Sequence, residues 1–279
     1  MELRKKGALF MVMSALCFAL MQIAIKASGD IPVMEQIFAR NIISLLIALV
    51  VIIKSGGSLF GGRKNQPLLF ARSFFGFAGL ISMFYACAHA NQADVTTLIK
   101  LSPFFIALLA AAFLKEKVGK VTIISMVLAF AGAIFVANPA FNSNIFPLLV
   151  AILCALFSSV SYTLLAYFKN RVSGMTIIMH FSTFSCVCSA IFMAGNFVVP
   201  DITQTILLLA IGVLGGLGQI FLTYSYRYAP ASEVSIYNYT GIIFSGLFGF
   251  LFFGEVLKMN SIIGIGLVLA ASVIVYKFS

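Results

Sequence analysis

Charged residues are scarce in this sequence, and tryptophan is missing altogether. Of its 279 residues only 9% are charged, whereas 62% are hydrophobic. Because a soluble domain carries about 25% charged residues, this composition excludes an ordinary soluble protein. Apolar runs of about 20 residues, separated by short polar breaks, match the hydrocarbon thickness of a bilayer. The chain is therefore predicted to be an all-α, multi-pass protein of the cell (inner) membrane, with tyrosine and phenylalanine replacing tryptophan at the lipid interfaces.

Motifs for catalysis, metal binding and nucleotide hydrolysis are also missing. The five cysteines all fall inside apolar runs without metal-ligand spacing, and their odd number argues against a disulfide framework. No HExxH segment, nucleophile elbow or P-loop occurs. We therefore expect no catalytic residue, no metal and no cofactor. Without a nucleotide-binding motif, any pumping would have to draw on a gradient of an ion or of the substrate.

Ten apolar segments are long enough to be membrane helices. The first follows a basic N-terminus, like the core of a signal peptide, but it continues past Cys17 to Ile25 and is therefore predicted to be a retained helix. None of the connections between segments is large enough to be a soluble domain. The predicted spans cover residues 7–26, 33–53, 68–88, 94–114, 121–137, 146–168, 174–199, 204–226, 233–253 and 260–276.

Basic residues set the predicted orientation of these spans. The net charge of +10 could indicate nucleic-acid binding, but the basic residues are spread over short loops, so we expect no nucleic-acid partner. Loops on one side hold 14 of the 18 basic residues, whereas the other side holds only Lys26 and Lys258. Both termini are therefore predicted to be cytoplasmic. The 14 are Arg4, Lys5, Lys6, Lys54, Arg63, Lys64, Arg72, Lys115, Lys117, Lys120, Lys169, Arg171, Arg227 and Lys277.

The two halves of the chain match each other at a constant offset of 139 residues. Each half, 1–139 and 140–279, would contain five helices, and an odd number makes the second half enter the membrane from the opposite side. The sequence thus predicts an inverted repeat, an architecture in which two halves of a transporter rock around a central site. Matching pairs include Tyr85 with Tyr224, Ala90 with Ala229, Val95 with Val234, Phe105 with Phe244, and Glu116 with Glu255.

Three stretches carry a resemblance to a known family. They are "FARNIISLLIAL" (38–49), "TTLIKLSPFFIALLAAAFLKE" (96–116) and "FSGLFGFLFFGE" (244–255). With them the chain resembles the EamA-type branch of the drug/metabolite transporter superfamily over essentially its whole length. The resemblance implies ten helices in two five-helix repeats, a small-molecule substrate carried across the lipid bilayer, and no enzymatic activity. It does not fix the substrate, because one fold serves many compounds.

Lys100 is an unexpected residue within an apolar span. It lies about six residues into the span, roughly 9 Å below the outer boundary at ~1.5 Å per residue, where a charge costs at least ~2.5 kcal/mol. Helical spacing puts Thr96, Lys100 and Pro103 on one face, and Pro103 removes a backbone donor, which predicts a bend. We interpret Lys100 and Thr96 as lining a substrate cavity. Alternatively, Lys100 could snorkel to the outer headgroups.

Arg40 is predicted to lie at a depth similar to that of Lys100, about seven residues into its span. Two cations facing one cavity would attract a carboxylate or phosphate. The alternative for Arg40 is a structural tie to neighbouring carbonyls or to Glu35. The sequence leaves both interpretations open.

The second half offers aromatic and amide groups where the first half has Lys100. At the offset of 139, Lys100 corresponds to Tyr239, which adjoins Tyr237 and Asn238. Their rings and polar tips suit an organic metabolite, although packing between helices would also explain the two tyrosines. Asn238 needs hydrogen-bond partners in lipid. We include all three among the candidate substrate-binding residues.

Three further residues complete the candidate site. His180 could titrate near neutral pH and couple protons to transport, or it could be a hydrogen-bonded structural residue. Tyr85 and Tyr224 end equivalent helices and could be gate or packing residues. The oligomeric state is predicted only as a monomer or a homodimer.

The predicted function is secondary-active or facilitative transport by alternating access. The substrate is expected to be a small metabolite with an anionic group, such as an amino acid or a related compound, and export is slightly favoured. Uptake of a nucleoside-like or adenosyl metabolite, or of a sugar phosphate, is an alternative. An alternative of another class is an intramembrane acyltransferase, because His89 and Asp94 have the spacing of a base and its orienting carboxylate.

Overall fold

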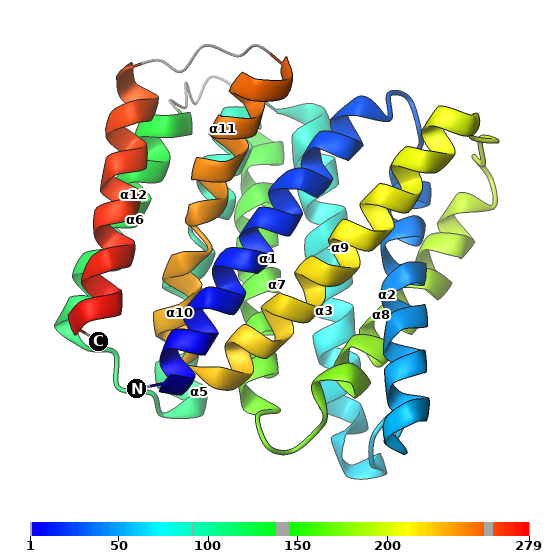
Figure 1. The fold of residues 1–279 in the computed structure, drawn as a ribbon, viewed down its shortest axis with the longest axis horizontal. Helices are drawn as coiled ribbons and strands as arrows, with labels where there is room; N and C mark the ends of the chain where they lie inside the picture. Colours follow the sequence, from blue (N-terminus) through cyan, green and yellow to red (C-terminus); the bar gives the residue numbers. More distant parts are fainter. Residues whose placement is uncertain (1, 91, 138–144, 254–258, 279) are drawn as a thin grey trace.

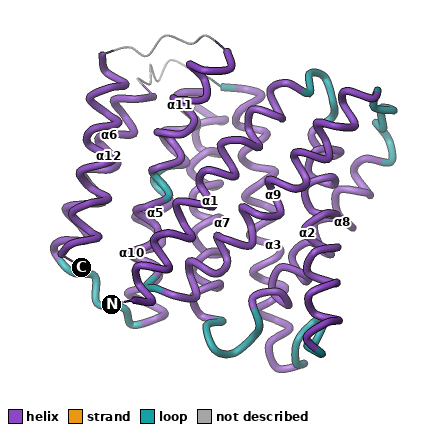
Figure 2. Tube along the Cα trace, viewed as in Figure 1, coloured by secondary structure: helices purple, strands orange, loops and turns teal. Residues whose placement is uncertain are grey.

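The computed structural model describes residues 2–90, 92–137, 145–253 and 259–278, which form a bundle of α-helices (Figure 1). No strand occurs in these ranges, and short loops connect the helices at the two ends of the bundle (Figure 2). A 3₁₀ turn, η1 (Arg63–Asn65), precedes α3. The helices are α1 (Glu2–Ala27), α2 (Val33–Ser55), α3 (Gln66–His89), α4 (Gln92–Ile99), α5 (Ser102–Leu114), α6 (Lys120–Ala137), α7 (Ile145–Tyr167), α8 (Gly174–Met193), α9 (Ile202–Tyr228), α10 (Ala231–Tyr237), α11 (Thr240–Phe253) and α12 (Met259–Phe278).

Seven helical segments of the described chain are long and apolar enough to cross a membrane. They include the α4–α5 stretch Val95–Leu114, and shorter apolar helices lie at Lys120–Phe135 and Ile262–Phe278. In hydrocarbon a helix satisfies its own backbone groups, which is why such apolar runs fold as helices. The all-helical membrane class is therefore confirmed, while the count of ten spans stays a prediction.

Each helix of the first half has a counterpart in the second half. Adding 139 to the bounds of α3 gives 205–228, against Ile202–Tyr228 for α9, and the same operation carries α4 onto α10 and α6 onto α12. Packing follows the same symmetry, because α1 packs on α9 as α7 packs on α3. The boundary predicted between residues 139 and 140 lies outside the described residues.

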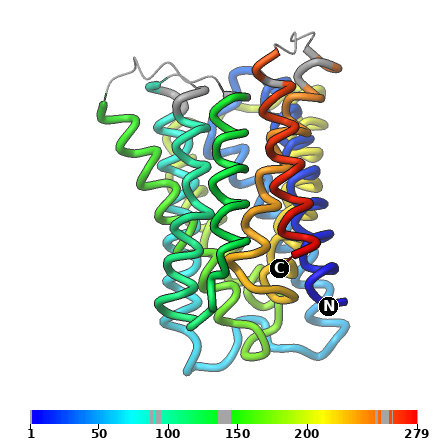
Figure 3. The backbone as a smooth tube through the Cα atoms, turned by 90° about the vertical axis from the view of Figure 1, so that its left-hand side faces the viewer, coloured from blue at the N-terminus to red at the C-terminus, as the bar shows by residue number. Residues whose placement is uncertain are grey.

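Both termini lie at the same end of the bundle, as the two views in Figures 1 and 3 agree. Two helices pack directly against their own counterparts in the other repeat: α2 packs on α8, and α6 packs on α12. The repeats thus interlock over several helices instead of forming two separate bodies.

The spans predicted at 94–114 and 233–253 are both broken. The first breaks at Lys100 and Leu101, next to Pro103, and so confirms the predicted bend. The second was predicted as one continuous helix, and this was wrong, because it breaks at Asn238 and Tyr239 without any proline. There the helical pattern gives way to tighter bonds between residues three apart, from the amides of Asn238 and Tyr239 to the carbonyls of Ser235 and Ile236.

The span predicted at 174–199 ends earlier than expected, since α8 stops at Met193. The next helix begins with a capping box, in which Asp201 accepts from the Gln204 amide at 2.7 Å. Residues 194–201 therefore form the connection between α8 and α9.

Candidate functional site

The two helix breaks meet, and repeat-equivalent residues contact each other there. The Tyr239 hydroxyl donates to the backbone carbonyl of Lys100 at 2.6 Å. In return, the Lys100 ammonium donates to the carbonyl of Asn238 at 3.3 Å and lies 5.9 Å from the centre of the Tyr239 ring. A broken helix leaves carbonyls without helical partners, and in a membrane each must be satisfied by protein. We call this contact between Lys100, Asn238 and Tyr239 the break crossing.

The other residues predicted around Lys100 do not all join the break crossing. The side chain of Thr96 is exposed on the surface of the chain. Tyr237 is buried but lies toward the end of the bundle that carries the termini, where it lines a pocket with Arg4 and Lys5. Only Tyr239 and Asn238 of the predicted second-half group therefore contact Lys100.

Arg40 is held by α9 and α1 and not by Glu35. Its guanidinium donates to the side-chain oxygen of Gln219 at 3.4 Å and lies over the ring of Phe18. Glu35 instead accepts from the backbone amide of Val198 at 2.8 Å. Gly215 makes room for the arginine, since a Cβ there would lie 2.6 Å from Cγ of Arg40. The structure therefore does not support the suggested tie to Glu35.

A second buried arginine, Arg72 of α3, is a residue that sequence analysis missed. Its side chain is 1% exposed, and its Nε and Nη1 atoms have no hydrogen-bond partner among the described residues. The guanidinium lies 4.0 Å from the centre of the Phe181 ring, and a Cβ at Gly76 would meet Nη1 at 3.3 Å. Its place near a span boundary made it look like a loop cation. The glycine four residues later, the counterpart of Gly215, was the available signal.

Arg40 and Arg72 share one environment. They lie within electrostatic range of each other and of the Tyr162 hydroxyl. The Tyr162 ring stacks on Tyr226 at 5.5 Å between centroids, and the Tyr226 hydroxyl has no partner among the described residues. No described carboxylate lies within ion-pair distance of either guanidinium. We call Arg40, Arg72 and Tyr162 the arginine cluster.

His180 lies beside this cluster. Its Nδ1 atom shares a hydrogen bond of 2.9 Å with the Ser73 hydroxyl, and Arg72 is within electrostatic range. Its ring and that of Phe60 form a T-shaped pair with 6.3 Å between the centroids. The structure therefore brings His180 to α3 through its bond with Ser73.

The paired tyrosines lie apart from both polar groups. Tyr85 is 38% exposed and stacks on His89 at 4.3 Å, while the Nδ1 atom of His89 bonds the Tyr85 carbonyl. Tyr224 packs beside Phe10 and Tyr228. Both tyrosines thus contact other aromatic rings, and whether they act as gate or packing residues stays a prediction. The side chain of Asp94 lies outside the described residues, so the predicted pair with His89 remains a prediction.

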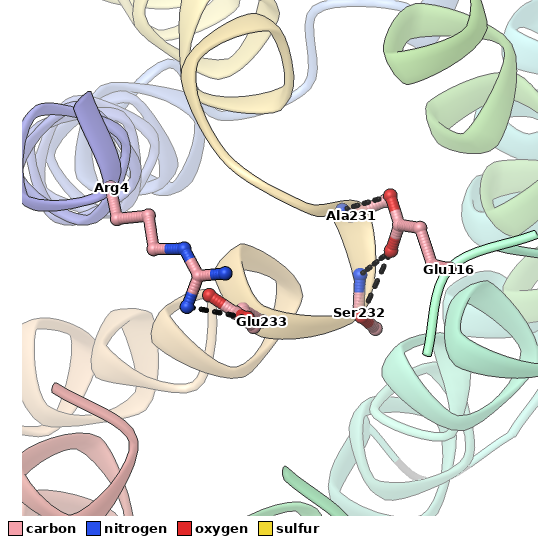
Figure 4. A network of polar contacts seen from close by, with 5 residues as sticks. All are labelled: Arg4, Glu116, Ala231, Ser232 and Glu233. Carbon is pink, nitrogen blue, oxygen red and sulfur yellow. Dashed lines mark hydrogen bonds and ion pairs between the residues drawn. The ribbon is translucent and has the colours of Figure 1, made fainter. Parts of the chain in front are cut away.

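Glu116 caps a helix of the other repeat (Figure 4). Its carboxylate accepts from the backbone amides of Ala231 and Ser232 at 2.9 and 3.2 Å, and from the Ser232 hydroxyl at 2.9 Å. On the other side of α10, Arg4 pairs with Glu233 at 3.3 Å. The start of α10 is therefore fixed from both sides. The equivalent Glu255 lies outside the described residues.

Comparisons with known proteins agree with this architecture. Residues 5–138 and 145–277 match the EamA-like transporter family. The chain is 31% identical to the pseudopaline exporter CntI of Pseudomonas aeruginosa, over 98% of this chain and 96% of that protein. It is 25% identical to a riboflavin transporter of Brucella anthropi, over 94% and 95% of the two chains.

More distant similarity extends to animals and to solved structures. Solute carrier family 35 member G1 of Mus musculus is 25% identical over 90% of this chain and 72% of its own length. One crystal structure, 17% identical, superposes with a TM-score of 0.85 over 97% of this chain and 96% of that chain. At that identity the superposition shows the fold alone. The chain therefore belongs to the EamA-like transporter family and is a multi-pass membrane transporter of small metabolites.

Proposed function

We propose that the transported metabolite carries an anionic group and that the arginine cluster receives it. The observation behind this proposal is the pair of neighbouring guanidinium groups, the buried Arg72 and the half-buried Arg40, with no described carboxylate in reach. Burying unpaired charge is costly, so the cluster is expected to gain its counter-charge from a ligand. A guanidinium binds a carboxylate or phosphate through two parallel hydrogen bonds.

Lys100 provides a third cation on the path of the substrate. Its ammonium has three donors, of which the structure shows one used, toward Asn238. We propose that Lys100 both braces the break crossing and attracts the anionic group. Together the three cations favour a carboxylated metabolite such as an amino acid or a related compound, and a phosphate-bearing metabolite fits the same charges.

Transport proceeds by alternating access of two inverted five-helix repeats. Support comes from the one-to-one correspondence of helices at an offset of 139 and from the discontinuous helices at the repeat interface. The proposed topology has ten spans, counting α4–α5 and α10–α11 as one span each. Both termini are proposed to be cytoplasmic, since loops at their end of the bundle hold most of the basic residues. Export follows the exporter among the relatives.

The nucleoside-like alternative is less well supported. It relied on stacking of a base on Tyr237 or Tyr239, but these side chains are only 7% and 0% exposed. One observation in its favour is that a riboflavin transporter is among the relatives. The acyltransferase alternative is not proposed, since the described His89 ring is stacked on Tyr85.

A ligand screen on the purified protein tests the charge of the substrate. Thermal stability should rise with anionic metabolites and should not rise with cationic ones of matched size, because only a compound that binds the folded state stabilises it. Arg72→Met should abolish the response, whereas Arg63→Met, in the exposed η1 turn, should retain it. Stabilisation by cationic compounds alone would contradict the proposal.

A further inference from the structure

A pocket of about 270 Å³ opens at the end of the bundle that carries both termini, apart from the arginine cluster. It lies between α1, α10 and α12. Its polar lining consists of Arg4, Lys5, Glu233, Tyr237, Tyr276 and Lys277, and its floor is apolar.

The charge of this pocket is unbalanced. Three cations line it against one carboxylate, Glu233, and that carboxylate is paired with Arg4 at 3.3 Å. Lys5 has a weaker contact, 5.7 Å from the centre of the Tyr276 ring. The positive charges of Lys5 and Lys277 therefore have no carboxylate partner within the lining. Residues from the two ends of the chain form this site only in the folded protein.

The position of the pocket points to an amphiphilic ligand. Its cations occupy the first turn of α1 and the last turn of α12, at the ends of two apolar helices. Toward the bundle centre the two helices expose Leu9 and Val273, which are 61% and 50% accessible. A ligand with its charge at the lysines would therefore run its apolar part along these helices. Basic pockets between membrane helices bind anionic lipid headgroups by this arrangement.

We propose that this pocket binds the phosphate of an anionic phospholipid. The phosphate oxygens accept hydrogen bonds from Lys5 and Lys277, a tyrosine hydroxyl faces the headgroup, and the acyl chains lie along α1 and α12. Glu233 belongs to the pocket and follows Ser232, which Glu116 caps. The bound lipid thus adjoins the start of α10 and should stabilise this end of the bundle.

Lipid titration of the full-length protein in detergent tests this proposal. The probes are diheptanoyl phosphatidylglycerol, diheptanoyl phosphatidylcholine and inorganic phosphate, and the readout is the melting temperature. Phosphatidylglycerol should raise it, while phosphatidylcholine and inorganic phosphate should not. The double variant Lys5→Gln/Lys277→Gln should bind phosphatidylglycerol more weakly, by roughly fivefold for each lysine removed.

Controls separate this site from general attraction to a basic protein. The double variant Lys64→Gln/Lys169→Gln removes the same charge at exposed positions and should bind phosphatidylglycerol as the parent does. Lys5→Arg, which keeps the charge, should retain binding. Arg4 is left unchanged so that its ion pair with Glu233 survives. Equal weakening in both double variants, or equal stabilisation by inorganic phosphate, would overturn the lipid site.

Discussion

The hydroxyl of Tyr239 donates to the backbone carbonyl of Lys100, its own counterpart in the other repeat, at 2.6 Å. In the opposite direction, the ammonium of Lys100 donates a hydrogen bond to the carbonyl of Asn238. Each half thus donates to a carbonyl at the break in the other half, although the Asn238 carbonyl also accepts from the Gly241 amide at 3.3 Å. This reciprocity joins the repeats at the place where a transporter built from inverted repeats has to bend.

Tyr239→Phe should destabilise the protein, because it removes a single buried hydrogen bond and leaves the Lys100 carbonyl unsatisfied. The expected loss is about 1–3 kcal/mol, measured by thermal or chemical unfolding in detergent. Tyr276→Phe, at a position 53% exposed on α12, is the matched control and should leave stability unchanged. Equal stability of the two variants would remove the break crossing from the account of the fold.

Lys100→Met should lower the affinity for the anionic substrate but should change the stability of the fold only slightly. It removes a cation and one long hydrogen bond of 3.3 Å, while the methionine stem preserves the packing. Uptake into proteoliposomes should show a raised KM, and Lys100→Arg should recover part of the affinity. An unchanged KM for Lys100→Met would leave Lys100 with a purely structural role.

Arg72→Met should abolish transport yet leave stability equal or higher. The Arg72 guanidinium contacts the Phe181 ring but has no described carboxylate partner. Burying such a charge costs free energy, and apolar replacements of similar volume are often neutral or stabilising, by about 1–4 kcal/mol. Melting without substrate and transport assays together separate the two effects. Arg227→Met is the contrasting variant, since Arg227 donates to the carbonyls of Phe168 and Val172, so its loss should lower stability. A large loss of stability in Arg72→Met would indicate a structural cation.

Glu116→Ala should lower the melting temperature by removing three hydrogen bonds to the start of α10. Hydrogen bonds to a charged group contribute about 1.5–3 kcal/mol, so the loss should be at least about 1.5 kcal/mol. The control is Glu2→Ala, which breaks an exposed pair with Lys6 of about 0.3–0.5 kcal/mol. If both variants melt alike, Glu116 does not fix α10.

His180→Gln tests proton coupling separately from hydrogen bonding. The amide can keep the bond to Ser73, but it cannot take up a proton near neutral pH. In proteoliposomes the parent should respond to an imposed pH gradient, and the variant should transport at a rate independent of it. A parent that ignores the gradient would exclude His180 from coupling.

Part of the site could be predicted from the sequence, because some of its signals are local. Lys100 and Arg40 could be identified because they are charges within apolar spans, and Pro103 predicted the bend beside Lys100. The break at Asn238 and Tyr239 has no such mark, because it depends on partners 138 and 139 residues away. Arg72 was missed because it lies near the predicted start of a span. A residue at that place can belong either to a loop or to a buried helix, and the sequence does not distinguish the two.

By itself the sequence determined the membrane class, most helix bounds and the repeat at an offset of 139 residues. Those properties depend on hydropathy along single segments and on a constant offset, which no packing can alter. Only the tertiary structure decided which distant residues come together: Arg40 near Arg72, Glu116 at the start of α10, and Lys5 and Lys277 in the lining of one pocket. The physical reason is that electrostatic and hydrogen-bond partners are chosen by distance in space, and helix packing brings together residues far apart in the chain.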